Sequence, residues 1–203
     1  MNYINYFSQL PIDSIILNDE KYHRIRVLFR SYKLLGRYLN SAIMQYNRIE
    51  EWANTQQKLG SRNVGGMDVI ENELLISDIH FLLLAMDKCN KIQTSLYRSL
   101  FGNDEANIFY NSPHVCNVRK MRNTLEHMDE YIKDDSRNKK YKLDKIFIDN
   151  GWSWLETQLL TLSKGKFSIK DCTLDFSVEM FNDSIAGLNN IATELMKQIN
   201  QLK

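Results

Sequence analysis

The sequence predicts a mainly α-helical domain, a bundle of four long helices with a small antiparallel β-meander inserted before the last helix. Apolar residues recur every three or four positions over four long stretches. The only two prolines, Pro11 and Pro113, lie outside those stretches. Between about 145 and 175 the apolar period shortens to two, which is the spacing of a strand. A chain of 203 residues can form one domain with its own core, so we expect a single domain over 1–203.

The first two predicted helices occupy the N-terminal half of the chain. The first runs from about 19 to 59, with Asn18 or Asp19 as its N-cap. Its apolar positions are Tyr22, Ile25, Phe29, Tyr32, Leu35, Leu39, Ile43, Tyr46 and Ile49. A glycine-rich linker over 59–68 precedes the second helix, which ends near 100. The apolar positions of this helix are Leu75, Ile79, Leu82, Met86, Cys89, Ile92, Leu96 and Leu100. The segment "FGNDEANIFYNSPH" after it is expected to be a turn.

The other two predicted helices flank the β-rich stretch. The third spans about 115–134, with the apolar positions Val118, Met121, Leu125, Met128 and Ile132. The last spans about 176–202, with Val178, Phe181, Ile185, Leu188, Ala192, Leu195, Ile199 and Leu202. Between them, Asn150-Gly151 and Lys164-Gly165 are expected to form the hairpin turns of a meander over 145–175. Four helices with one apolar face each can bury those faces only against one another, which predicts the bundle.

Charge, cysteines and hydropathy narrow the classes of function. Lys and Arg total 26 against 25 Asp and Glu, so binding of nucleic acid by an overall positive field is excluded. Cys89, Cys116 and Cys172 are far apart, and we expect them to be free thiols in a reducing cytosol. The longest nearly apolar run, 79–86, is far short of the ~20 residues of a membrane span. The N-terminal residues lack the pattern of a signal peptide. We therefore expect a cytoplasmic protein without a membrane partner.

No cofactor or metal site is predicted. Three histidines have no carboxylate or thiol at ligand spacing: His23, His80 and His114. Gly65-Gly66 follows no predicted strand, so a linker is favoured over a phosphate-binding loop. Trp152 and Trp154 alternate on a predicted strand. We expect them to pack the meander onto the bundle, with stacking on nucleic-acid bases as the alternative.

The stretch "MRNTLEHMDEYI", residues 121–132, places polar side chains away from the apolar stripe of the third helix. At ~100° per residue, His127 lies on the side opposite to that stripe, and Asn123 lies one turn before it, within reach of its side chain. Arg122 lies on the flank. Such a face meets either water or another molecule. On spacing alone a solvated face is favoured, with Arg122 and Glu126 as an ordinary i,i+4 ion pair.

The string "RNTLEH" resembles the signature of the HEPN superfamily, which is an arginine, a polar residue directly after it, and a histidine after four intervening residues. The resemblance covers the bundle, about 19–134 and 176–202, and leaves the β-meander outside. HEPN domains include many metal-independent endoribonucleases of toxin–antitoxin, antiviral defence and RNA-processing systems, and also non-catalytic binding or scaffold modules. In one toxin branch a tyrosine stands two residues after the histidine. Here Asp129 occupies that place, and Tyr131 comes two residues later.

The resemblance implies that Arg122, Asn123 and His127 are catalytic, and their chemistry suits cleavage of RNA by its own 2′-hydroxyl. Histidine titrates near neutral pH, so His127 can accept or donate a proton. Arg122 is permanently charged and can stabilise the charge that develops on the phosphate. Asn123 can orient the imidazole or donate to the phosphate. Since one helix offers one histidine, a homodimer that joins the two polar faces would bring two His127 side chains into one cleft.

Neighbouring residues are expected to hold the substrate. We expect Arg119, Lys120 and Tyr131 to contact RNA, while the mixed charges of residues 133–142 fit a solvated surface equally well. The leading hypothesis is a dimeric, metal-independent endoribonuclease, a toxin or defence effector, with an antitoxin or other regulatory protein as a candidate partner. The alternative is a non-catalytic HEPN-like helical module that binds RNA, a nucleotide or a partner protein.

Overall fold

The computed structural model describes residues 1–5, 20–59, 69–126, 161–163, 166–169, 172–175 and 178–202. Its helices are η1 (Glu20–Tyr22), α1 (His23–Leu59), α2 (Val69–Leu100), α3 (Asn103–Tyr110), α4 (Pro113–Glu126), η3 (Val178–Phe181) and α9 (Asn182–Leu202). Its strands are β1 (Thr161–Ser163), β2 (Lys166–Ile169) and β3 (Cys172–Asp175). The mainly helical class predicted from the sequence is confirmed.

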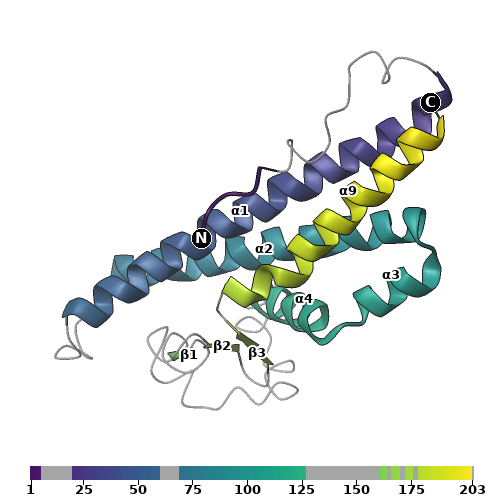
Figure 1. Ribbon diagram of the computed structural model, residues 1–203. Helices are drawn as coiled ribbons and strands as arrows, with labels where there is room; N and C mark the ends of the chain where they lie inside the picture. Colours follow the sequence, from purple (N-terminus) through teal and green to yellow (C-terminus); the bar gives the residue numbers. More distant parts are fainter. Residues whose placement is uncertain are drawn as a thin grey trace.

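Helix α2 is the centre of the fold. It contacts α1, α3, α4 and α9, and α1 in turn packs against α9. Figure 1 shows α9 lying across α2 and running beside the N-terminal half of α1, with α3 and α4 beside the C-terminal half of α2. A helix with neighbours on several sides must bury more than one face. Accordingly, α2 buries its apolar stripe and also a row of polar side chains, namely Asp87, Asn90, Gln93 and Thr94.

The core is formed by the apolar stripes that the sequence predicts. Of the nine positions predicted for the first helix, which the structure divides between η1 and α1, all are buried except Phe29, which is partly buried against the core. The largest fully buried side chains include Tyr32, Leu35, Met86 and Phe181. Cys89 belongs to this core, and burial raises the pKa of its thiol. Each such side chain contributes about 1.5–3 kcal/mol by leaving water, which is why the periodicity of the sequence specifies the bundle.

Three sequence-based expectations about the helices are wrong in detail. The segment after residue 100 is not only a turn, because it contains the eight-residue helix α3. The next helix begins at Pro113 rather than near 115, since proline fits the first turn, where its missing N–H has no helical partner. Two predicted core positions at the ends of the last stripe are exposed, Val178 in the short 3₁₀ helix η3 and Leu202 at the last turn of α9.

The described strands form a three-stranded antiparallel sheet in the order β1-β2-β3. Ser163 lies opposite Lys166, and Ile169 lies opposite Cys172. These strands are short and begin only at Thr161, so they do not establish the meander predicted over 145–175. The hairpin turns predicted at 150–151 and 164–165 lie outside the described residues. Among the described helices, none has an apolar stretch long enough to cross a membrane.

Candidate functional site: the polar face of α4

The two faces of α4 differ as the helical wheel predicts. Val118 and Met121 are buried, and Leu125 packs against the core with part of its surface exposed. Lys120 and Asn123, on the other side, are exposed to solvent. The predicted positions Met128 and Ile132 lie outside the described residues. Within its described length, α4 therefore carries one buried stripe and one open polar face.

Arg122 stands at the border between these two faces, beside three acceptor side chains; its Nη atoms make hydrogen bonds, whereas Nε has an ion-pair contact but no hydrogen bond. Its Nε lies 3.5 Å from Oδ2 of Asp87 on α2. Its Nη1 pairs with the carboxylate of Glu126, and its Nη2 donates to Oδ1 of Asn123. The side chain of Arg122 is 19% exposed, so one edge of the guanidinium reaches solvent while the other faces α2. The i,i+4 ion pair with Glu126 that the spacing suggests is thus confirmed.

Asp87 is the anchor of this arrangement. Its side chain is only 4% exposed, and the Nζ of Lys91 lies 2.7 Å from the same Oδ2 that faces Arg122. A buried carboxylate is costly unless cations and hydrogen bonds compensate it. Two cations, one from α4 and one from the next turn of α2, do so here. The core of the protein therefore fixes the position of the Arg122 guanidinium.

Sequence reasoning missed Asp87 and Lys91. A signal was present, because Asp87 directly follows the nearly apolar run of residues 79–86. A carboxylate at the end of such a run is expected to need a partner from elsewhere in the fold. The pair with Lys91 follows from a spacing of four on one helix, whereas the contact with Arg122 could not be read from the sequence, since Arg122 lies on another helix.

The other predicted site residues fall into two groups. Arg119 is drawn toward α3: its guanidinium lies 4.3 Å from the centre of the Tyr110 ring, and its Nη2 lies 3.5 Å from Sγ of Cys116. Lys120 projects from the open face beside Asn123. His127 and Tyr131 lie outside the described residues, so the contact between Asn123 and His127 stays a prediction.

Within the part of the chain that the structure describes, no group of three or more His, Cys, Asp or Glu side chains is placed to hold a metal ion. His80 stacks near Phe81, with the ring centres 6.2 Å apart. His114 is largely buried, and its Nε2 has no hydrogen-bond partner. Burial lowers the pKa of His114 below its ordinary 6.5, and the carboxylate of Asp183 partly opposes this shift.

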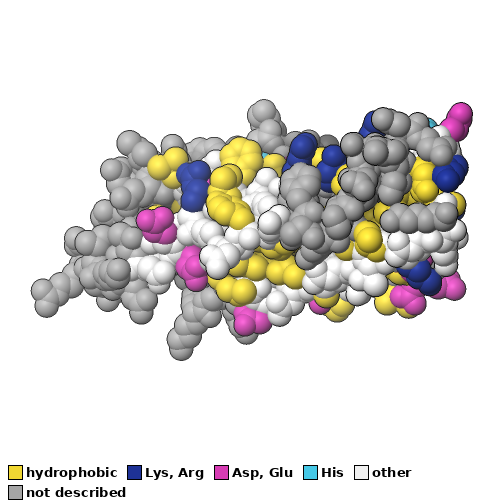
Figure 2. Space-filling model, turned by 45° about the horizontal axis from the view of Figure 1, so that its top comes forward, with side chains coloured by type: hydrophobic (Ala, Val, Ile, Leu, Met, Phe, Trp, Pro, Cys, Tyr) yellow, Lys and Arg dark blue, Asp and Glu magenta, His cyan; other side chains and the backbone are white. Residues whose placement is uncertain are grey.

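Charge on the molecular surface is mixed. On the face shown in Figure 2, basic and acidic side chains are interspersed among apolar ones. This distribution agrees with the net charge of +1 and with a local rather than a global site for a charged ligand.

Comparison of the chain with protein-family models, curated proteins and solved structures finds no match. The assignment of a function therefore depends on the "RNTLEH" motif and on the geometry of α4.

Proposed function

We propose that this chain is a metal-independent endoribonuclease of the HEPN type, with Arg122, Asn123 and His127 as its catalytic side chains. The observation that carries the proposal is the placement of the Arg122 guanidinium. One edge is anchored by the buried carboxylate of Asp87, and the other lies beside Asn123 on the open face of α4. A permanently charged donor that is already held in place needs little reorganisation when a phosphate arrives, which is the property that stabilises a charged transition state.

The proposed reaction needs only groups that the RNA and the protein supply. The 2′-oxygen attacks the adjacent phosphorus, and the bond from phosphorus to the 5′-oxygen breaks. One imidazole accepts the proton of the 2′-hydroxyl, and a second proton donor protonates the leaving 5′-oxygen. The products are a 2′,3′-cyclic phosphate and a 5′-hydroxyl. A homodimer that joins two α4 faces supplies the second proton donor, the partner's copy of the same histidine, and a second guanidinium.

The two carboxylates around Arg122 have different roles in this proposal. Asp87 is buried and stays on Nε as the anchor. Glu126 is half-buried and belongs to the same helix, and an i,i+4 pair of this kind contributes only about 0.3–0.5 kcal/mol. An RNA phosphate can therefore displace Glu126 from Nη1 at little cost, while Asp87 keeps the guanidinium in place.

One observation favours the second candidate, a non-catalytic helical module that binds RNA, a nucleotide or a partner protein. Nε, Nη1 and Nη2 of Arg122 each face an acceptor of the protein itself. An arginine whose task is to fasten α4 to α2 would lie among acceptors in the same way, although Nε is buried here without a hydrogen bond. In that case the exposed side chains Lys120 and Asn123 form a binding surface and not a catalytic one.

Incubation of purified protein with total cellular RNA in excess EDTA tests the proposal. The variants are His127→Ala, Asn123→Ala and Arg122→Lys. The matched control is His23→Ala, which removes an exposed histidine at the start of α1. Cleavage by the wild type and the control but not by His127→Ala, with 2′,3′-cyclic phosphate ends, supports the nuclease. Equal cleavage by His127→Ala, or no cleavage by a folded wild-type protein, favours the binding module.

Expression in cells separates the two candidates a second time. A nuclease toxin stops growth, and His127→Ala relieves the arrest. A binding module is tolerated in both forms. Light scattering on the purified protein tests the dimer, because the composite cleft requires two chains.

A further inference from the structure

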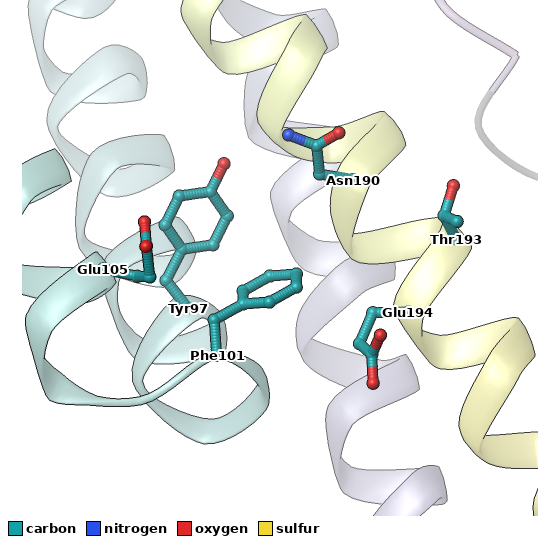
Figure 3. Close-up of a pocket in the computed structure, with 6 residues that line it drawn as sticks. All are labelled: Tyr97, Phe101, Glu105, Asn190, Thr193 and Glu194. Carbon is teal, nitrogen blue, oxygen red and sulfur yellow. The ribbon is translucent and has the colours of Figure 1, made fainter.

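A hollow of about 520 Å³ opens between the C-terminal end of α2, the short helix α3 and the middle of α9. The described residues that line it are Tyr97, Phe101, Glu105, Asn190, Thr193 and Glu194 (Figure 3). Tyr97 stands about three helical turns along α2 from Asp87, so the hollow is separate from the polar face of α4.

Two aromatic rings form one wall of the hollow. The rings of Tyr97 and Phe101 meet edge to face, with centres 5.3 Å apart, and Phe109 of α3 supports Tyr97 from another side at 5.3 Å. Phe101 is 40% exposed, and in Figure 3 its ring points across the hollow toward α9. Its position is fixed because its N–H donates to the carbonyl of Tyr97 at 2.7 Å. The next residue, Gly102, has a φ of 104° that favours glycine.

The two charged residues among the described lining of the hollow are both acidic. Glu105 comes from α3 and Glu194 from α9, and none of the described lining residues is basic. The C-terminal end of α2 adds the partial negative charge of its free carbonyl groups. That end already attracts a guanidinium, since Nη2 of Arg24 donates to the carbonyl of Ser99 at 2.8 Å. The carboxylate of Glu194 has two partners on its own helix, since Nζ of Lys197 lies 3.6 Å from its Oε2 and Nε2 of Gln198 donates to its Oε1 at 3.2 Å, and a guanidinium would compete with both.

A buried amide without a partner lies about one helical turn before Tyr97 on α2. Gln93 is fully buried, and neither its Oε1 nor its Nε2 has a hydrogen-bond partner. If Gly187 carried a Cβ, that atom would lie 1.9 Å from Nε2 of Gln93 and 3.0 Å from the hydroxyl of Tyr97. The hydroxyl of Tyr97 and the amide of Gln93 therefore both lie close to Gly187, although Gln93 does not itself line the hollow. Unsatisfied buried amides are rare in native proteins and call for a partner with hydrogen-bond donors or acceptors.

We propose that this hollow binds a guanidinium group. A guanidinium is planar, so it can stack on the exposed face of Phe101, and it is more weakly hydrated than an ammonium. Its five N–H donors suit the carboxylates of Glu105 and Glu194 and the oxygens of Tyr97 and Asn190, all from residues that line the hollow. The group belongs either to a free guanidino compound or to an arginine side chain of a partner protein. The proposal is independent of RNA cleavage.

Calorimetric titration of the purified chain tests this site. The probes are N-acetylarginine amide, its neutral isostere N-acetylcitrulline amide, and a glycine pentapeptide with one central arginine. The variants Glu105→Gln and Glu194→Gln each remove one rim charge. Asp104→Asn is the matched control, because it removes the same charge from the adjacent, exposed position of α3, which does not line the hollow. Thermal melting checks that all variants fold.

The expected result is binding of the arginine probe at least tenfold tighter than of the citrulline probe. Each glutamine variant should weaken this binding about tenfold, and Asp104→Asn should leave it unchanged. A pentapeptide that binds more tightly than the single residue identifies a protein partner, and equal affinities identify a free guanidino compound. The proposal is overturned if no arginine probe binds at about 10 mM, if citrulline binds equally, or if Asp104→Asn loses as much affinity as Glu105→Gln.

Discussion

Nε of Arg122 lies 3.5 Å from Oδ2 of Asp87, and this ion pair fastens α4 to α2 at the edge of the core. The pair joins two helices that are far apart in the sequence, and one of its members belongs to the proposed catalytic motif. Because Asp87 is nearly inaccessible to solvent, the contact contributes both to the stability of the fold and to the position of the guanidinium.

Replacement of Asp87 by Asn is expected to lower the free energy of unfolding by about 2–4 kcal/mol. The neutral amide keeps the shape of the side chain but leaves Arg122 without its buried counter-ion. Urea unfolding measures the change. The control is Lys91→Gln, since Lys91 is 50% exposed and its pair should contribute less than about 1 kcal/mol. If the two variants lose the same stability, Asp87 is not the anchor of this network.

Replacement of Glu126 by Gln tests the exchangeable partner of Arg122 and depends on the proposed function. The variant frees Nη1 and makes the α4 face more positive by one charge. Affinity for single-stranded RNA is expected to rise about two- to fivefold, with a steeper dependence on salt. Fluorescence anisotropy over a salt series measures both. Glu20→Gln in η1 removes the same charge elsewhere, and an equal gain there would show that only the net charge matters.

The sequence predicts the long helices well because each buries a single apolar stripe. Helix α1 illustrates this, since Leu35, Leu39 and Ile43 follow the helical period and all three are fully buried. The second buried face of α2 carries no apolar stripe, so the sequence did not predict its burial. Asn90 and Gln93 are polar but buried by tertiary packing, and Gln93 lies where Gly187 of α9 comes close. Helix α3 was missed because its eight residues bury only Ala106, so no stripe marks it.

Only those contacts of the candidate site that join residues close in sequence could be predicted. The pair of Arg122 with Glu126 follows from a spacing of four within one helix. The pair of Arg122 with Asp87 depends on how α4 packs against α2, and no local pattern specifies it. The hollow around Phe101 likewise depends on tertiary packing, because its walls come from three helices.

Replacement of Gly187 by Ala is expected to destabilise the protein by about 1–3 kcal/mol, although alanine is the better helix former by about 1 kcal/mol. The new Cβ would lie 1.9 Å from Nε2 and 2.5 Å from Cδ of Gln93, which is itself buried between α2 and α9. Adding Gln93→Ala should restore part of the loss, because it removes the clashing atoms. Urea unfolding of the two single variants and the double variant measures this coupling, and strict additivity would contradict it.

Acidification is expected to weaken the fold through His114. Its pKa is lower in the folded state than its ordinary 6.5, because burial disfavours the charged imidazole. Above about pH 6.5 both states are neutral and the group has no effect on stability. As the pH falls below 6.5 the unfolded chain takes up a proton that the folded protein resists, so the free energy of unfolding decreases until the pH reaches the folded pKa.

Urea unfolding between about pH 5 and 7.5 measures this dependence. His114→Gln should flatten it, since the titrating group is gone. Asp183→Asn should make it steeper, because the carboxylate of Asp183 raises the pKa of His114 and its loss widens the gap between the folded and unfolded values. This variant also acts in the first turn of α9, where a negative charge is favourable, so its stability should fall at every pH. The slope of the free energy of unfolding against pH therefore separates the effect of His114 titration from the effect of the negative charge at the N-terminus of α9. An unchanged slope in His114→Gln would assign the pH dependence to other groups.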